Sequence, residues 1–200
     1  MSTTVVLATR NPGKIAELRR ILADYDVELL GLDDFPDVPE VAETGETFEA
    51  NALLKAHAVA KATGLLAVAD DSGLAVAALN QMPGILSARW SGRHGDDAAN
   101  LDLVLAQISD VPDERRGAAF VCAAAAATPD GREVVAEGQL DGRLLRGPRG
   151  TNGFGYDPIF VPLGGDRTTA ELDAEEKDAI SHRGKAFRAL AARLGTLLGR

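Results

Sequence analysis

The feature that most constrains this chain is its alternation of short apolar runs with segments of helical periodicity. Residues 3–9 (TTVVLAT) are β-branched and apolar, which is typical of a strand buried on both faces. In residues 14–22 (KIAELRRIL) the apolar side chains recur at helical spacing, and residues 27–32 form a second apolar run. We therefore predict that the chain opens with a β-α-β unit, in which Asn11-Pro12-Gly13 is a turn.

The same alternation continues toward the C-terminus. The expected elements are a helix over 48–63 and strands over 65–69, 117–128 and 133–140. Another amphipathic helix is marked by Leu101, Val104, Leu105 and Ile108, and Asp96 or Asp97 is available to cap it. Gly64 is placed to end the first helix, and Pro129-Asp130-Gly131 is a hairpin signal between the last two strands. Asp173 and Glu176 form a capping-box pattern before a helical C-terminal region. Alternating strands and helices with one hairpin predict an α/β fold with a mixed sheet.

The composition narrows the class of protein. Of 200 residues, 46% are apolar and 26% charged, which is typical of a globular chain, here predicted as one domain over 1–200. The net charge of -9 argues against a nucleic-acid partner or an anionic membrane surface, because both need a basic face. A single cysteine, Cys122, excludes a disulfide framework and suits a reducing cytoplasm. With neither a signal-peptide pattern nor an apolar run of about 20 residues, a soluble cytoplasmic protein is expected.

The first candidate site lies between the first strand and the first helix. It comprises Thr9, Arg10, Asn11, Pro12, Gly13 and Lys14. A helix N-terminus presents N–H groups and a positive dipole to phosphate, and Lys14 adds a charge. The alternative is a plain βα turn, which the local pattern alone favours, because this is not the G-x-x-x-x-G-K-[ST] loop.

A second candidate is Asp70-Asp71-Ser72-Gly73, which follows the apolar run 65–69. Ligand sites in open α/β sheets gather beyond the carboxyl ends of strands. At most one of the two carboxylates is expected to point into a site, where it could hold Mg²⁺ or orient a water, while the other ties down the turn. A capped turn explains the same residues equally well.

Charged residues also gather on and before the helix predicted over 48–63. Asn51 and Lys55 lie four positions apart and therefore share a face, and Glu43 precedes them in an acidic loop. Without further context, a solvated lysine is the better interpretation of Lys55.

Two further candidates lie in the C-terminal third. Residues 150–158 (GTNGFGYDP) combine glycines with two aromatic rings, which suggests a backbone that approaches a ligand closely, although an irregular loop is the alternative. Ser181 is a plausible cap for the last helix, which puts His182 and Arg183 in its first turn, where cations oppose the helix dipole. A ligand would explain that placement, and so would solvated charges. The three histidines show no paired metal-ligand spacing.

Taken together, these segments resemble the non-canonical purine nucleoside triphosphate pyrophosphatases, the inosine/xanthosine triphosphatase family. The resemblance covers nearly the whole chain. The matching motifs are LATRNPGK, ETGETFEANALLKA, ADDSGL, PGILSARWSG, NGFGYDPIF and AELDAEEKDAISHRGKA. Each motif is weak alone, but six in the right order are hard to produce by chance.

The resemblance implies a fold and an activity. The fold is a long, curved mixed β-sheet flanked by helices in two lobes, with the nucleotide in a central cleft. The activity is Mg²⁺-dependent hydrolysis of ITP, dITP and XTP to the monophosphate and pyrophosphate, which clears these nucleotides before they enter DNA or RNA. A homodimer is also implied.

The resemblance further implies roles for individual residues. Residues Thr9 to Lys14, together with Lys55, would bind the triphosphate. Asp71 would be the catalytic base and a metal ligand, and Ser72 would contact the substrate. The purine pocket would comprise Phe154, Gly155, Tyr156, Asp157, Lys177, His182 and Arg183. Members of the family often have an acid where this chain has Ala42, so we assign Glu43 as the second metal ligand.

The chemistry of these groups fits that substrate. Lys177 and Arg183 can only donate hydrogen bonds, and hypoxanthine and xanthine present a 6-oxo acceptor where adenine presents an amino donor. A buried unmatched donor costs about 1–3 kcal/mol, enough to reject ATP by one to two orders of magnitude. Guanine also carries a 6-oxo group, so its exclusion must come from crowding near the 2-amino group.

Two other functions remain to be weighed against hydrolysis. A regulatory module that binds purine triphosphates without cleaving them is suggested by the missing acid at Ala42. A nucleotide-sugar or dinucleotide enzyme is suggested by the α/β pattern and the glycine-rich loop, but the chain lacks the acidic residue expected about 20 positions after a G-x-G-x-x-G turn.

Overall fold

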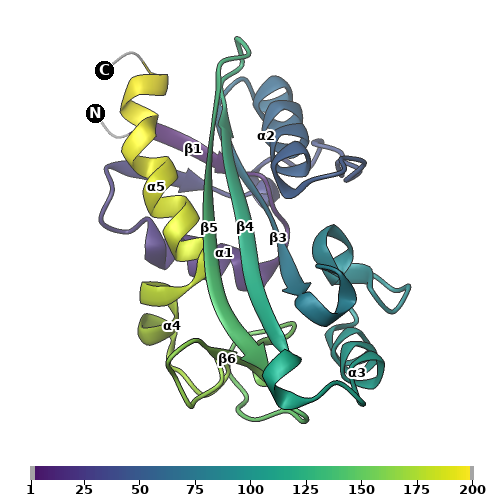
Figure 1. Cartoon of the computed structure of the whole chain (residues 1–200). Coiled ribbons are helices and arrows are strands. Elements are labelled where there is room, and N and C mark those ends of the chain that lie inside the picture. The colour runs from purple at the N-terminus through teal and green to yellow at the C-terminus, as the bar shows by residue number, and fades with distance from the viewer. Residues whose placement is uncertain (1–2, 199–200) are drawn as a thin grey trace. The chain divides into compact units, whose positions relative to one another are not determined.

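The strands of this protein form one six-stranded sheet in the order β2-β1-β3-β4-β5-β6, seen in a computed structural model that describes residues 3–198 (Figure 1). The strands are β1 (Thr3–Leu7), β2 (Val27–Leu30), β3 (Leu66–Val76), β4 (Gly117–Ala127), β5 (Glu133–Leu144) and β6 (Phe160–Pro162). The helices are α1 (Pro12–Ile21), α2 (Phe48–Thr63), α3 (Asp97–Gln107), α4 (Ala174–Ile180) and α5 (His182–Leu197). β1 pairs in parallel with β2 and β3, whereas β5 and β6 are antiparallel, so the predicted mixed α/β sheet is confirmed.

The chain divides into two compact units. Unit 1 comprises the residues up to Asp71, Cys122–Gly138 and the residues from Arg183 onward. Unit 2 comprises Ser72–Val121 and Gln139–His182. The division falls within strands β3, β4 and β5, each of which contributes residues to both units.

Unit 1 has a core on each side of its strands, because successive side chains of a strand point to opposite faces. Leu7, Val68 and Ala124 pack with side chains of α1 and α5, including the predicted helical stripe from Phe187 to Leu197. Val6, Ala67 and Ala125 lie in a second cluster with side chains of α2. Figure 1 shows α2 and α5 on opposite sides of these strands. This double coverage explains why the strands are apolar on both faces.

Unit 2 has a separate core. The end of β3 contributes Leu74 and Val76, which pack with Val104 of α3 and with Phe160. Gly73 allows a close approach in this unit, since a Cβ there would lie 2.4 Å from the Gly84 carbonyl oxygen and from Ser87 Oγ. This packing carries β3 seven residues past the predicted end at Ala69.

Two segments predicted as turns are parts of regular elements. Pro12 is the first residue of α1, and Asn11 caps the helix by accepting a hydrogen bond from the Lys14 backbone N–H at 3.1 Å. Proline fits there because the first turn needs no N–H partner within the helix. Asp70-Asp71-Ser72-Gly73 lies inside β3 rather than beyond it. The expectation that these carboxylates follow the end of a strand is therefore wrong.

The other predicted elements are close to those observed. The helix over 48–63 has the predicted bounds, and Gly64 ends it in the left-handed conformation with φ 69°. β4 and β5 flank the predicted turn, in which the Gly131 N–H donates to the Thr128 carbonyl at 3.0 Å. The capping box of Asp173 and Glu176 is present. The short strand β6 was not anticipated. No helix within residues 3–198 is long and apolar enough to cross a membrane.

Candidate active site

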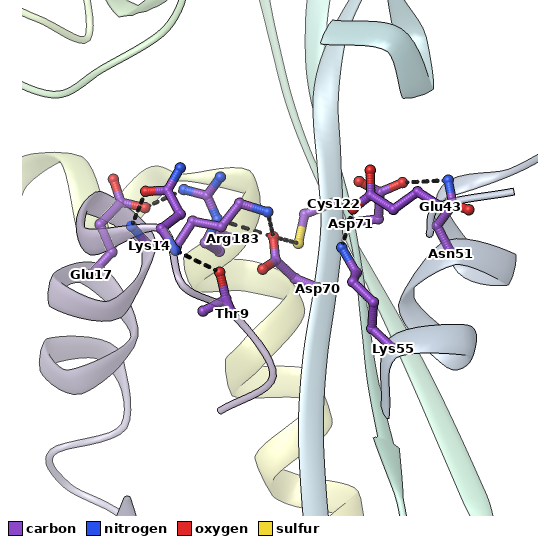
Figure 2. A network of polar contacts seen from close by, with 11 residues as sticks. Thr9, Lys14, Glu17, Glu43, Asn51, Lys55, Asp70, Asp71, Cys122 and Arg183 are labelled. Carbon is purple, nitrogen blue, oxygen red and sulfur yellow. Dashed lines mark hydrogen bonds and ion pairs between the residues drawn. The ribbon is translucent and has the colours of Figure 1, made fainter. Parts of the chain in front are cut away.

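Strand β3 places two adjacent carboxylates on opposite sides of unit 1 (Figure 2). Both are buried, with Asp70 2% and Asp71 5% exposed. Asp70 points toward α1 and the start of α5, whereas Asp71 points toward α2. The alternation that we expected of two adjacent residues in an extended chain is therefore present, although no turn is involved.

The Asp70 side is a buried network of alternating charges. Lys14 Nζ lies 2.8 Å from Asp70 Oδ2, and Arg183 Nε lies 3.4 Å from the same oxygen. Arg183 also forms an ion pair with Glu17 of α1. Burial opposes ionisation of Asp70, but Lys14, Arg183 and Lys55 outweigh it and hold its pKa well below the ordinary value. Asp70 is thus held as an anion at neutral pH, where it joins α1, β3 and α5.

The Asp71 side combines carboxylates with an amide and one cation. Asn51 Nδ2 donates to Asp71 Oδ2 at 2.9 Å, and Lys55 Nζ lies 2.6 Å from Glu43 Oε1. Burial raises the pKa of Asp71; Glu43 adds to that rise, and Lys55 and the Asn51 hydrogen bond oppose it. Burial opposes the charge on Lys55, but Asp70, Asp71 and Glu43 together raise its pKa. Lys55 is therefore not the solvated surface lysine that its local sequence suggests.

The segment from Thr9 to Lys14 forms an exposed helix N-terminus. Thr9 Oγ1 accepts from the Asn11 N–H at 3.2 Å, which shapes the turn into α1, and Arg10 donates to the Val38 carbonyl at 3.0 Å. Pro12 and Gly13 lie in the first turn, which carries no acidic side chain. Such a terminus offers backbone N–H groups to an anion beside Lys14.

Unit 2 holds the second group of predicted residues around Asp157. Its carboxylate accepts from Lys177 Nζ at 2.6 Å, from the Phe154 N–H at 2.9 Å and from Thr169 Oγ1 at 2.7 Å. Lys177 Nζ also lies 5.1 Å from the centre of the Phe154 ring, within the range of a cation–π contact. Asp157 therefore holds the lysine and the aromatic ring together.

The glycine-rich loop is anchored at several points. A Cβ at Gly153, whose φ is +75°, would lie 2.1 Å from Asp157 Oδ2, so only glycine fits there. The Gly155 N–H donates to Asp97 Oδ2 at 2.8 Å, and Tyr156 Oη donates to the Ser87 carbonyl at 2.7 Å. Burial, with Asp97, raises the pKa of Tyr156, which keeps the phenol neutral. The loop is thus an ordered part of unit 2.

The remaining predicted residues fall at the ends of these groups. Ser72 is half-buried on β3 in unit 2. The buried His182 ring is stacked on Phe120, with centroids 4.9 Å apart. Arg183 lies in unit 1 and is 3% exposed. The residues assigned to the phosphates and the metal therefore lie in unit 1, and so does Arg183. Ser72 and the other residues assigned to the purine pocket lie in unit 2.

The sequence analysis singled out Asn51 and Asp70 without giving either a role in the site, and it did not find Glu17. Asn51 was noted for its spacing from Lys55, and that i, i+4 spacing beside an acidic loop was the available signal. Glu17 lies in α1, where it is buried. Its partner Arg183 is 166 positions away, so no local pattern marks the pair.

Asp71 and Glu43 are the carboxylates in this network that could hold a metal ion. Among residues 3–198, no group of three or more Asp, Glu, His or Cys side chains forms a complete protein cage. Mg²⁺ commonly takes one or two carboxylates and completes its shell with water and substrate phosphates. A buried carboxylate whose pKa is raised, beside a second carboxylate, suits such a cation.

Comparisons with known proteins agree on one family. The model of the Ham1 family matches residues 5–193. The dITP/XTP pyrophosphatase of Streptomyces coelicolor is 66% identical over 98% of this chain and 100% of its own length. Its counterpart in Mycobacteroides abscessus is 63% identical over 97% and 96% of the two chains.

Solved structures give the same result. A HAM1 protein from Coxiella burnetii superposes with a TM-score of 0.87 at 43% identity, covering 97% of this chain and 99% of that one. A nucleoside-triphosphatase / dITP/XTP pyrophosphatase from Mycobacterium abscessus superposes with a TM-score of 0.77 at 65% identity, covering 96% and 99%.

Proposed function

The chain belongs to the Ham1 family, and from that premise we propose that it hydrolyses dITP, ITP and XTP to the nucleoside monophosphate and pyrophosphate. Relatives at 58–66% identity over nearly the whole chain, named dITP/XTP pyrophosphatases, support this activity. Such hydrolysis removes these nucleotides before they enter DNA or RNA. The observation that carries the proposal is the buried Asp71 of β3, which accepts a hydrogen bond from Asn51 of α2. The neighbouring residue on β3, Asp70, forms an ion pair with Lys14 of α1.

Unit 1 would bind the triphosphate. The first turn of α1, with Thr9, Arg10, Asn11, Pro12 and Gly13, offers N–H groups to phosphoryl oxygens, and Lys14 and Lys55 add charge. Hydrolysis of an anhydride needs its developing negative charge neutralised, and fixed cations do this without reorganising. The ion pair of Lys14 with Asp70 holds the lysine in place before substrate binds.

Asp71 would act as the general base. Its burial raises its pKa toward the range in which a carboxylate accepts a proton from water most effectively. The Asn51 amide fixes one carboxylate oxygen, which orients the group. An oriented carboxylate of this kind can hold and deprotonate the attacking water.

Asp71 and Glu43 would hold Mg²⁺, and the donor set fits this ion. Both ligands are carboxylates, which Mg²⁺ prefers, and the partial protein shell leaves positions for phosphate oxygens. When bound, the ion would polarise the phosphoryl group and lower the pKa of a coordinated water. Lys55 neutralises part of the negative charge on this pair.

Unit 2 would hold the purine. Phe154 offers a ring for stacking, and Lys177 offers donors to a 6-oxo group. Ser72, Gly155, Tyr156, Asp157, His182 and the unit 1 residue Arg183 are the further proposed contacts. Since Lys177 cannot accept a hydrogen bond, adenine's 6-amino group would leave it unmatched, and ATP would be a poor substrate.

The remaining properties of the protein are proposed from its family. Both units would act as one catalytic domain over 1–200, and the protein would be a cytoplasmic homodimer with no nucleic-acid or membrane partner. The net charge of -9 supports the absence of a nucleic-acid partner. Light scattering of the purified protein, at about 42 kDa for a dimer, tests the oligomeric state.

The test of the activity is a side-by-side assay of pyrophosphate release from ITP, XTP, GTP and ATP with Mg²⁺. We expect ITP and XTP to be hydrolysed at least ten times faster than ATP, in line with the cost of an unmatched buried donor. Equal rates for ITP and ATP would refute the proposal. Tight ITP binding without any product would instead favour a regulatory module.

A further inference from the structure

We propose that Asn51 is the positioning residue of the metal site, and that it holds Asp71 and the loop carrying Glu43 at a set separation. The inference rests on the proposed function, in which these two carboxylates are the metal ligands. Asn51 itself would touch neither metal nor substrate.

The side-chain amide of Asn51 bridges two separate segments of unit 1. Its Nδ2 donates to Asp71 Oδ2 at 2.9 Å, and its Oδ1 accepts from the Gly45 N–H at 2.7 Å. Asn51 lies in α2 and is fully buried at 0% exposure. One planar group therefore connects β3 to the acidic loop through α2, and Figure 2 shows its contact with Asp71.

Gly45 seats the acidic loop directly on α2. A Cβ at this position would lie 2.7 Å from Ala50 Cβ and 2.8 Å from Asn51 Oδ1, which real side chains do not tolerate. Glu43, two residues earlier, reaches Lys55 one helical turn beyond Asn51. The loop is therefore held at two points on the same face of α2, and this places its carboxylate on the Asp71 side of β3.

A neutral amide suits this role better than a charged group. It fixes a carboxylate oxygen without neutralising it, so the negative charge of Asp71 and Glu43 stays available to a divalent cation. Mg²⁺ demands near-ideal octahedral geometry, so the separation of its ligands matters. Groups that orient metal ligands typically change metal affinity or activity by about 10–100-fold when removed.

The experiment compares the Mn²⁺ affinity of Asn51→Ala, Gly45→Ala and wild type. Binding is measured as the decrease in the electron paramagnetic resonance signal of free Mn²⁺. Titrations are run with and without α,β-methylene-ITP, and the midpoint of Mg²⁺ activation of ITP hydrolysis is measured in parallel. We expect Asn51→Ala to weaken Mn²⁺ binding about tenfold or more and to shift the Mg²⁺ midpoint upward. The KM for ITP at saturating Mg²⁺ should change by less than about threefold, because the phosphate-binding turn is intact.

Gly45→Ala removes no polar side chain, but its Cβ would displace the acidic loop or the Asn51 amide. It should also weaken Mn²⁺ binding, by a smaller factor than Asn51→Ala does. Gly31→Ala is its matched control, since a Cβ there has only the Asp33 backbone nitrogen nearby, at 3.9 Å, and it should bind Mn²⁺ like wild type.

Thermal unfolding of the metal-free variants separates positioning from folding. Unchanged Mn²⁺ affinity in the folded Asn51→Ala and Gly45→Ala proteins overturns the proposal, whatever their melting temperatures, and so does a wild type that binds no Mn²⁺. A wild type that binds Mn²⁺ but releases no pyrophosphate from ITP refutes the proposed function instead. In that case the Mn²⁺ titrations still decide the role of Asn51.

Discussion

The two sides of β3 in unit 1 give the same residue type opposite properties. Asp70 and Asp71 are adjacent, both are buried, and each accepts a hydrogen bond from a neighbouring side chain. Asp70 faces Lys14 and Arg183, and its pKa is lowered against the effect of burial. Asp71 faces an amide, a lysine and a second carboxylate, and burial with that carboxylate raises its pKa.

The comparison shows that burial alone does not decide what a carboxylate does. Burial disfavours the anion on both sides, and the charges of the facing elements decide the outcome. Two cations turn Asp70 into a permanent link between elements. At Asp71, Lys55 and Asn51 offset the effect of burial only in part. The carboxylate can therefore exchange a proton or bind a cation, which is the property that catalysis requires.

The largest expected effect is on catalysis at Asp71. Asp71→Asn should lower kcat for ITP about 10²–10⁴-fold, the usual contribution of general-base catalysis, because the amide cannot take a proton from water. Stopped-time assays of pyrophosphate measure the loss. ITP binding, followed by calorimetry, should persist. A variant that fails to fold would contradict the assignment, because Asp71 would then be a structural residue.

The next effect is on stability at Asp70. Asp70→Asn leaves Lys14 and Arg183 facing a neutral group, and breaking a buried ion pair in this way typically costs about 3–5 kcal/mol. Urea unfolding at pH 7 measures the change. If the free energy of unfolding fell by less for Asp70→Asn than for Asp71→Asn, the comparison of the two sides would be broken.

The smallest expected effect is on the pH dependence of stability. The folded-state pKa of Asp70 is lowered, so its stabilising contribution is present above the ordinary carboxyl pKa of about 4 and is lost as the pH falls below it. The folded-state pKa of Asp71 is raised, so its ionisation destabilises the folded protein at neutral pH. That destabilisation disappears as the pH falls through the raised value toward about 4.

Urea unfolding of metal-free wild type and both Asn variants between pH 4 and pH 8 checks these signs. Asp71→Asn should be more stable than wild type at pH 7 and should converge with it as the pH falls. Asp70→Asn should remain less stable throughout this range. If both variants were more stable than wild type at pH 7, or both less stable, the opposite pKa shifts of Asp70 and Asp71 would be wrong.

The sequence by itself determined the features that depend on neighbours along the chain. The bounds of α2, its end at Gly64 and the capping box of Asp173 and Glu176 follow from propensity and from hydrogen bonds between residues three or four apart. The six motifs, in order, pointed to the family that the comparisons confirm. The βα turn, by contrast, was misplaced because Asn-Pro-Gly suits a turn as well as a helix start.

Only the tertiary structure decided which charges meet. Asp70-Asp71-Ser72-Gly73 has good turn chemistry, but the buried Leu74 and Val76 keep it in β3 by packing in the core of unit 2. The partners Glu17 and Arg183 lie at opposite ends of the chain. Electrostatic and packing energies depend on distance in space, so a local sequence pattern could nominate Asp71 but could not give it Asn51 as its partner or distinguish it from Asp70.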